Sequence, residues 1–356
     1  MKINIILPAI GHSGGIDVIY KYTQLLIEEG HDVLVYKEIK ASNMHRYNSK
    51  IKNFIHRCYC SCKAISASRN PKTCDKFVWS INNLTIRDAD VVIATSWPTA
   101  FTIIDLTSSK GKKFYFIQDF EIWDNKKLGL ESYMLPLNKI VISTWINNQL
   151  KEHLNIGPFP VVMNGIELVK FHSRTTVNYK KDDIIQFLML NHTLEKKGVK
   201  CGIEAYERIH KLYPNTRLKM FGMCSGDNLP EYVEYIQNPP QGKLVELYCE
   251  SDIFLFPSLE EGWGLTPIEA MACGCAVVGT NTGFVLDLGK HQENMMISEP
   301  GDVDFLFQNI KILIDDNDLI VKIKDNGNKI VQQLNWTESS KILFEILKES
   351  QRKRSL

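Results

Sequence analysis

Two carboxylates flank a glycine-rich turn, with Glu261 before the turn and Glu269 after it. Gly262 and Gly264 allow backbone conformations that other residues avoid, and they let a ligand approach the main chain closely. The turn joins an expected strand, 253–256, to an expected helix whose first N–H groups suit an anion. Because a carboxylate beside a phosphate would be repelled, we expect the two glutamates to hold neutral hydroxyl groups near that anion. A sugar nucleotide combines a diphosphate with hydroxyl-rich rings, so this pattern favours it as the ligand.

A purely structural interpretation of the same residues is a capping box at the start of the helix. Thr266 would be the N-cap, Pro267 the first helical residue and Glu269 the N3 residue. Glu269 would then only accept a backbone N–H, which contributes roughly 0.5–2 kcal/mol. Capping explains neither Glu261 nor the paired glycines, so we prefer the ligand interpretation.

The stretch resembles the E-x7-E signature of the retaining glycosyltransferases of family 4. Glu261 and Glu269 occupy its two positions, and Glu-Gly-Trp-Gly-Leu replaces the usual Glu-Gly-Phe-Gly-Leu. Residues 274–280 resemble the family's Gly-x-Pro-Val-Val strand, with Ala276 at the position where Pro is common. Residues 161–171 resemble the family's Val-Ile-Pro-Asn-Gly-Val-Asp segment. The resemblance implies an α/β GT-B fold, in which two Rossmann-like doubly wound parallel-sheet domains face each other across a cleft. The C-terminal domain would bind the nucleotide-sugar donor, and the N-terminal domain the acceptor.

The resemblance also indicates how the donor diphosphate is held. The family's Gly-Arg-Leu-x3-Lys-Gly segment corresponds to residues 191–198, where Lys197 matches the lysine and His192 stands in place of the arginine. A neutral His192 could donate one hydrogen bond to phosphate and a protonated one could pair with it, or Lys196 could supply the missing charge. No Asp-x-Asp pair is placed to hold a metal ion, so we expect neither a metal nor a cofactor. The donor itself would be a UDP-, GDP- or dTDP-sugar.

Further roles follow from the resemblance. Glu261 is expected to hold sugar hydroxyls, Glu269 the nucleotide ribose and Lys197 the diphosphate. Many relatives place a histidine after a first-domain strand, but here Gln118 or Asp119 takes that position, and Asp119 could instead cap the next segment. Retention can proceed by front-face attack, with the donor phosphate accepting the acceptor's proton, so no protein base is obligatory. The expected catalytic residues are Glu261, Lys197 and Asp119, and the expected donor-binding residues are Gly14, Gly15, His192, Lys197, Glu261, Gly262, Trp263, Gly264, Leu265 and Glu269.

Apolar runs and helical periodicity alternate along the chain, as in doubly wound sheets. The domains are expected at 1–165 and 166–335, with 336–356 as a helix that returns to the N-terminal domain and 173–183 as a polar linker. Strands are expected at 3–7, 32–36, 90–94, 113–117, 139–143, 184–190, 217–221, 253–256 and 276–279, and helices at 16–29, 144–153 and 198–212.

Composition limits the remaining functions. A length of 356 residues suits two domains, and a net charge of +1 gives no general attraction to nucleic acid. No apolar run approaches the roughly 20 residues that cross a bilayer, and the N-terminus is expected to be a strand and not a signal peptide. The odd number of cysteines, nine in all, favours a reducing cytoplasm. Cys58, Cys60 and Cys62 alternate along the chain, a spacing that fits a zinc site poorly.

One segment, 37–76, is strongly basic, with ten Lys and Arg residues against Glu38 and Asp75. It is either a solvated face of a long insertion or a docking surface for an anionic membrane or a phosphate-bearing acceptor. Peripheral attachment to the inner face of the cell membrane would follow from the second interpretation. Nucleic acid is not expected, because no recognised binding motif accompanies the charge.

These features predict retaining transfer of a hexose or deoxyhexose from a nucleotide sugar to a lipid-linked or polysaccharide acceptor in cell-surface glycan synthesis. Two alternatives remain open. One is a nucleotide-sugar epimerase of the same fold, which would act without an acceptor. The other is a non-catalytic sugar-nucleotide-binding partner of a polysaccharide assembly complex, which the replacement of arginine by His192 leaves open.

Overall fold

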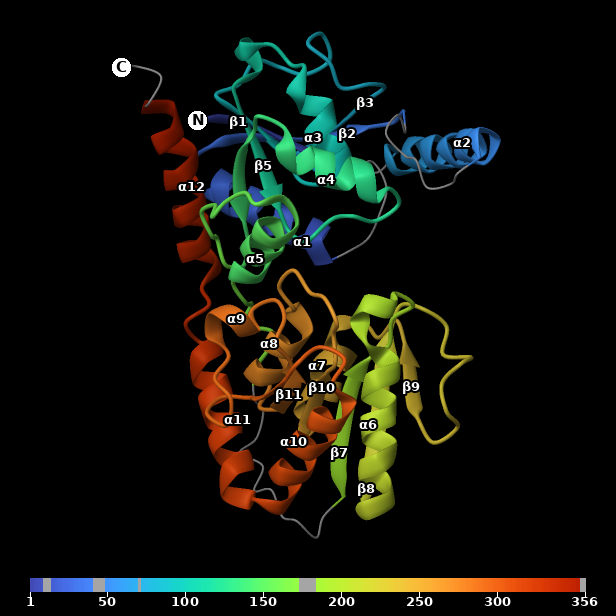
Figure 1. Ribbon diagram of the computed structural model, residues 1–356. Coiled ribbons are helices and arrows are strands. Elements are labelled where there is room, and N and C mark those ends of the chain that lie inside the picture. Colours follow the sequence, from blue (N-terminus) through green and yellow to red (C-terminus); the bar gives the residue numbers. More distant parts are fainter. Residues whose placement is uncertain (9–13, 41–48, 70–71, 173–183, 353–356) are drawn as a thin grey trace. The chain divides into compact units, whose positions relative to one another are not determined.

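The computed structural model describes residues 1–8, 14–40, 49–69, 72–172 and 184–352, so the expected linker 173–183 lies outside the described residues. The chain divides into two compact units (Figure 1). The first consists of Met1–Ile142, Ile146–Asn164 and Trp336–Leu356. The second consists of Ser143–Trp145 and Gly165–Asn335.

The first unit is built on a parallel six-stranded sheet with the strand order β3-β2-β1-β4-β5-β6. Its strands are β1 (Lys2–Leu7), β2 (Asp32–Glu38), β3 (Asp75–Val78), β4 (Val91–Ala94), β5 (Lys112–Ile117) and β6 (Asn138–Val141). Its helices are α1 (Gly14–Glu28), α2 (Lys50–Ala67), α3 (Trp97–Ile104), α4 (Lys126–Met134) and α12 (Trp336–Arg352), with the short helix η1 (Ser108–Lys110); α5 (Thr144–Leu154) lies mostly in this unit.

The second unit repeats this topology with the order β12-β11-β10-β7-β8-β9, again all parallel. Its strands are β7 (Ile185–Leu190), β8 (Thr216–Gly222), β9 (Glu234–Gln237), β10 (Ile253–Phe256), β11 (Ala276–Thr280) and β12 (Met296–Ser298). Its helices are η2 (Glu195–Lys197), α6 (Val199–Leu212), α7 (Gln241–Cys249), α8 (Leu265–Ala272), α9 (Val285–Leu288), α10 (Val303–Asp315) and α11 (Asn317–Val331). Both units therefore have the strand order of the Rossmann fold, and the expected α/β class is confirmed.

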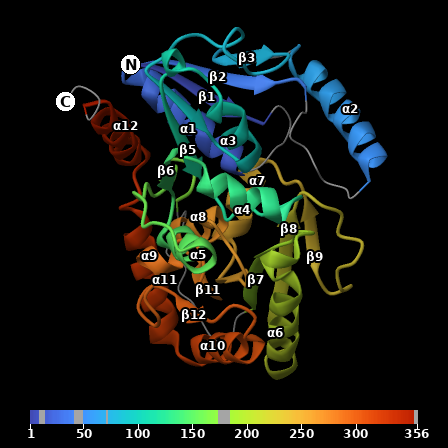
Figure 2. The ribbon, with the colours of Figure 1, turned by 45° about the horizontal axis from the view of Figure 1, so that its top comes forward.

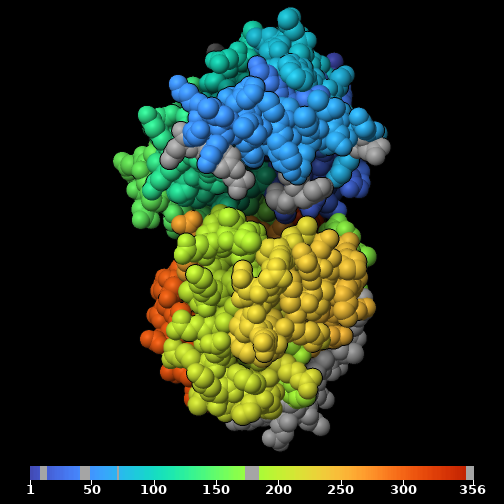
Figure 3. All heavy atoms as spheres, turned by 90° about the vertical axis from the view of Figure 1, so that its right-hand side faces the viewer, coloured from blue at the N-terminus to red at the C-terminus, as the bar shows by residue number. Residues whose placement is uncertain are grey.

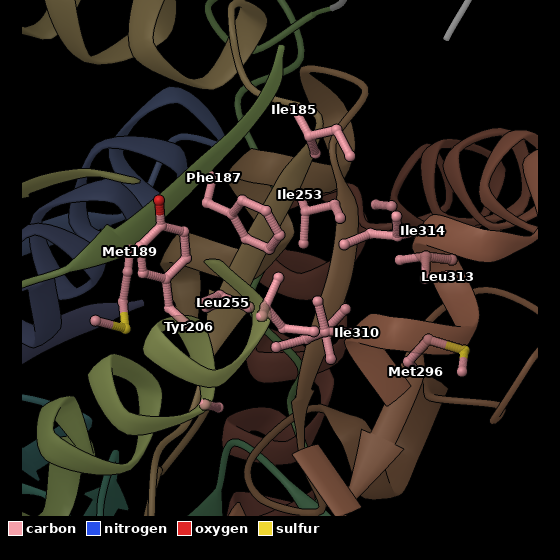
Figure 4. Packing of buried hydrophobic residues seen from close by; sticks show 14 of the residues in the cluster. Ile185, Phe187, Met189, Tyr206, Ile253, Leu255, Met296, Ile310, Leu313 and Ile314 are labelled. Carbon is pink, nitrogen blue, oxygen red and sulfur yellow. The ribbon is translucent and has the colours of Figure 1, made fainter. Parts of the chain in front are cut away.

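Burial explains why the central strands are apolar throughout. All residues of β4, β10 and β11 are buried, because helices cover both faces of a parallel sheet. In the second unit, Phe187 and Leu255 meet Ile310 and Leu313 of α10 in one hydrophobic core (Figure 4). Tyr206 of α6 closes the same core, with its ring edge toward Phe187 at 5.3 Å between centroids.

Local signals place several helix ends. Gly30 has φ +85°, a left-handed conformation suited to glycine, and it ends α1 as expected. The helix itself begins at Gly14, two residues before the expected start. The C-terminal helix α12 packs on α1. The ring of Trp336 packs edge-on against that of Tyr22, with 5.3 Å between the ring centroids.

The described part of the basic segment 37–76 contains helix α2 and strand β3. Lys37 forms an ion pair with Asp75 at 3.0 Å, so this charge is compensated within the sheet. On α2, Cys60 is buried while Cys58 and Cys62 are exposed. Among the described residues, no group of three or more His, Cys, Asp and Glu side chains could hold a metal ion.

Candidate functional site

The predicted donor residues of the second unit gather where the carboxyl ends of β7 and β10 lie side by side. The chain runs from β7 toward β8 and β9 on one side and later returns to β10 on the other. This reversal of strand order is a switch point, and α/β sheets bind ligands at such points. The turn after β7 carries His192 and Lys197, and the loop after β10 carries Glu261.

Backbone contacts hold these two loops together. The N–H groups of Leu259 and Glu260 both donate to the carbonyl oxygen of Lys196, at 2.7 and 3.2 Å. Gly198, with φ +63°, lies against Pro257 so closely that a Cβ would be 1.8 Å from the proline carbonyl oxygen. Only glycine fits at this contact, which sets the position of Lys197 relative to the loop that follows β10.

Lys197 and Glu261 are directly paired. Lys197 Nζ donates to Glu261 Oε2 at 2.5 Å, and the two side chains are 19% and 15% exposed. They come from positions 64 residues apart, and the sequence predicted a separate ligand group for each. The pairing places the ammonium predicted to contact a diphosphate next to the carboxylate predicted to hold sugar hydroxyls.

The residues between the glutamates are mostly buried. Trp263 is 3% exposed, and its ring packs edge-on against that of Phe284 with 6.2 Å between the ring centroids. The indole Nε1 of Trp263 is buried with no hydrogen-bond partner among the described residues. Gly262 is also buried. Gly264 has φ +94° and is the N-cap of α8, which begins at Leu265. An unpartnered buried N–H costs folding free energy, and the described residues do not offset that cost here.

Glu269 is not a capping residue. Because α8 begins at Leu265, Glu269 lies two positions beyond N3, and the capping-box interpretation is wrong. Its Oε2 accepts a hydrogen bond from the hydroxyl of the fully buried Tyr248 at 2.9 Å. Burial raises the pKa of Glu269 to about 7, while the bond from Tyr248 opposes that rise.

We expect Glu269→Gln to stabilise the protein increasingly as pH rises. The pKa of Glu269 is higher in the folded than in the unfolded state, so ionisation between about pH 4.5 and 7 costs folding free energy. Glutamine has no such cost. The unfolding free energy of the variant minus that of the parent should increase by about 1–3 kcal/mol from pH 5 to pH 8. Denaturant titrations at several pH values measure this difference.

Tyr248→Phe provides the matched comparison for that experiment. Removing the hydroxyl removes the bond that favours the ionised carboxylate, so the stability of this variant should fall more steeply with pH than that of the parent. If the unfolding free energies of the parent and of Glu269→Gln changed with pH in the same way, the raised pKa of Glu269 would be contradicted.

Burial and hydrogen bonding favour the neutral form of His192. Its Nδ1 accepts the backbone N–H of Leu194 at 3.0 Å, which leaves the ring proton on Nε2. Burial lowers the pKa of His192, and the charges of Lys197 and Lys196 lower it further. In this form His192 would offer one N–H to a phosphate oxygen, and the alternative that Lys196 supplies the missing charge stays open.

The first unit carries the other predicted residues. Gly14 and Gly15 open α1, which follows β1, and a Cβ on Gly15 would lie 3.5 Å from the side-chain amide of Gln118. The Oε1 atom of Gln118 is buried without a partner among the described residues. Asp119 is partly buried, and its Oδ1 accepts the N–H of Phe120 at 2.9 Å. The next helix, α4, is capped by Asn125 and not by Asp119.

Sequence reasoning gave no role to Glu121, two residues further on. This carboxylate is 6% exposed, and its Oε2 accepts the backbone N–H of Trp97 at 2.7 Å and the hydroxyl of Tyr115 at 2.8 Å. It thereby fixes the start of α3 beside the switch point between β1 and β4. A signal was present in the sequence, because Glu121 is an acidic residue in the segment that follows the apolar strand ending at Ile117.

Two Rossmann-like sheets in one chain, with these residues at the carboxyl ends of the strands, define the GT-B class of glycosyltransferase fold. Comparisons with known proteins agree with this fold assignment. Residues 174–330, which make up most of the second unit, match the family described as "Glycosyl transferases group 1".

Individual relatives are similar at low identity. The capsular polysaccharide biosynthesis glycosyltransferase CapM of Staphylococcus aureus is 28% identical over 209 residues, which cover 53% of this chain and 55% of CapM. Sucrose-phosphate synthase from Thermosynechococcus elongatus has a TM-score of 0.73 at 17% identity over 98% of both chains. HepE of Anabaena in complex with UDP-glucose has a TM-score of 0.70 at 14% identity, over 98% of this chain and 100% of HepE. At these identities the structures show the fold alone. The chain spans about half the length of the curated relatives that it matches.

Proposed function

We propose that this protein is a retaining glycosyltransferase that moves a hexose or deoxyhexose from a nucleotide sugar to a polysaccharide or lipid-linked acceptor. The observation that carries the proposal is the Lys197–Glu261 pair at the switch point of the second sheet, at 2.5 Å. A glycosyl donor presents a diphosphate and sugar hydroxyls next to each other, and this pair offers a group for each. CapM, which acts in capsular polysaccharide biosynthesis, supports a surface glycan as the acceptor class.

The proposed mechanism uses fixed charge and dipoles. As the bond to the sugar breaks, negative charge develops on the diphosphate, and the ammonium of Lys197 and the Nε2–H of His192 stabilise it. Glu261 holds the sugar hydroxyls and Glu269 the ribose, and the donor phosphate accepts the acceptor's proton. No step requires a metal ion.

A non-catalytic donor-binding role is the second candidate. The specific observation that favours it is His192 at the position of the family's arginine, because burial lowers the pKa of this histidine and a neutral ring supplies one cation fewer for the leaving group. Transfer of sugar by the purified protein would exclude this role. Conversion of the nucleotide sugar without an acceptor would instead indicate an epimerase.

Thermal shift with UDP-, GDP- and dTDP-sugars, without added metal, tests donor binding. A ligand at about 100 times its dissociation constant should stabilise the protein by roughly 2.7 kcal/mol and raise Tm by a few degrees. UDP-glucose is the first donor to test, because HepE is bound to it. The same panel with Glu261→Gln serves as the control, since a specific shift should be lost. A flat panel for the parent protein would contradict the proposed donor site.

A further inference from the structure

Helix α2 exposes its apolar side. Its large apolar residues follow helical spacing, and the residues most exposed are Ile51 at 73%, Phe54 at 64%, Ile55 at 62% and Tyr59 at 54%. Cys58, Cys62 and Ile65 continue the same stripe and are also exposed. Ordinary amphipathic helices turn such a stripe toward the core. A stripe of this size in solvent marks an interaction surface.

The opposite side of α2 is buried. Asn53, Cys60 and Ala64 are the buried residues of the helix, and they are smaller than the residues of the exposed stripe. In both ribbon views α2 lies beyond the β3 edge of the sheet (Figures 1 and 2), and its atoms lie at the front of the unit in Figure 3. The contact side and the exposed side are therefore distinct.

The charges beside the stripe have one sign. Lys50, Lys52 and Lys63 are exposed on α2, and the helix contains no Asp or Glu. On a helical projection, Lys50 lies at one border of the stripe, and Lys52 and Lys63 lie at the other. Long lysine side chains can reach charged lipid headgroups from this position while the apolar side chains enter the acyl boundary.

We propose that α2 binds the surface of an anionic membrane by lying in its interface, with Ile51, Phe54, Ile55 and Tyr59 among the lipids. The charge pattern favours lipid over a protein partner or a second copy of the chain, since acidic headgroups complement all three lysines. This inference extends the proposed function by naming the surface that brings the enzyme to a membrane-held acceptor. It does not depend on catalysis, because binding to vesicles needs neither donor nor acceptor.

Vesicle co-sedimentation at low and moderate salt tests the proposal. The full chain should bind vesicles of phosphatidylglycerol and phosphatidylcholine, and it should bind vesicles of phosphatidylcholine alone much more weakly. Phe54→Ser/Ile55→Ser should weaken binding at least about tenfold. Lys50→Gln/Lys52→Gln/Lys63→Gln should weaken it by about tenfold to a hundredfold, most strongly at low salt.

A matched control is Leu84→Ser, because Leu84 is 97% exposed and lies outside α2; this variant should bind like the parent. A fluorophore on Cys58 in a Cys62→Ser background gives a second readout, and its emission should shift to the blue on anionic vesicles. Donor-induced thermal shifts should be the same in the α2 variants as in the parent, which separates this proposal from the donor site.

Three results would overturn the proposal. One is absence of binding to anionic vesicles by the parent chain. Another is equal binding by the parent and by Phe54→Ser/Ile55→Ser. The third is a concentration-dependent dimer that is lost in Phe54→Ser/Ile55→Ser, because a second copy of the chain would then cover the stripe.

Discussion

Lys197→Met is expected to lower the rate of sugar transfer by about 10²–10³, with a smaller effect on donor affinity. Loss of one preorganised donor to a developing anion typically has this effect. Lys197 is placed for that role by the contact of Gly198 with Pro257 and by its bond to Glu261 at 2.5 Å. Glu261→Gln should cause a comparable loss. Because the two side chains touch, the double variant should lose much less than the product of the single effects. Steady-state kinetics with the donor identified by thermal shift measures all three.

Two neighbouring lysines are the controls. Lys200→Met alters an exposed lysine of α6 and should leave transfer unchanged. Lys196→Met separates the alternatives for the missing arginine, since a large loss there would assign the second positive charge to Lys196. If Lys197→Met and Glu261→Gln both retained full transfer, the proposed site would be wrong.

Gly198→Ala is expected to destabilise the second unit by about 2–5 kcal/mol. The new Cβ would lie 1.8 Å from the carbonyl oxygen of Pro257, which belongs to backbone and cannot move as a flexible side chain would. Overpacking typically costs about 1–3 kcal/mol, and a left-handed conformation costs alanine about 1–2 kcal/mol more. Tm should fall by about 5–15 °C, as followed by calorimetry. Relief of the clash would displace the loop that holds Glu261, so donor binding should weaken too.

Gly301→Ala isolates the conformational part of this effect. Gly301 lies in the same unit with φ +82°, and the nearest atom to an added Cβ would be a methyl carbon of Leu259 at 3.8 Å. Its substitution should cost only about 1–2 kcal/mol. Equal losses for the two variants would show that the contact with Pro257 is not a constraint.

Local sequence was enough to predict the central strands of both sheets, whereas the chemistry assigned to the main motif stays a prediction. The apolar runs of β10 and β11 indicated buried parallel strands because both faces of such strands are covered, and their observed bounds lie within one residue of the expected ones. The spacing of Glu261, Glu269 and the glycines between them indicated a polar ligand beside a helix start. Each of these features depends on residues a few positions apart.

The tertiary structure alone determines which of these side chains contact one another. It also determines which side of a helix is covered by other parts of the chain. The bond between Lys197 and Glu261 joins two loops that are distant in the sequence, and it exists because β7 and β10 are neighbours in the sheet. Glu269 accepts a hydrogen bond from Tyr248 of another helix, and the sequence of its own segment does not indicate this partner. The periodicity of α2 specifies an apolar stripe, but whether that stripe faces protein or solvent depends on how the helix packs against its unit. Strand order and helix packing are long-range properties, and local spacing carries no information about either.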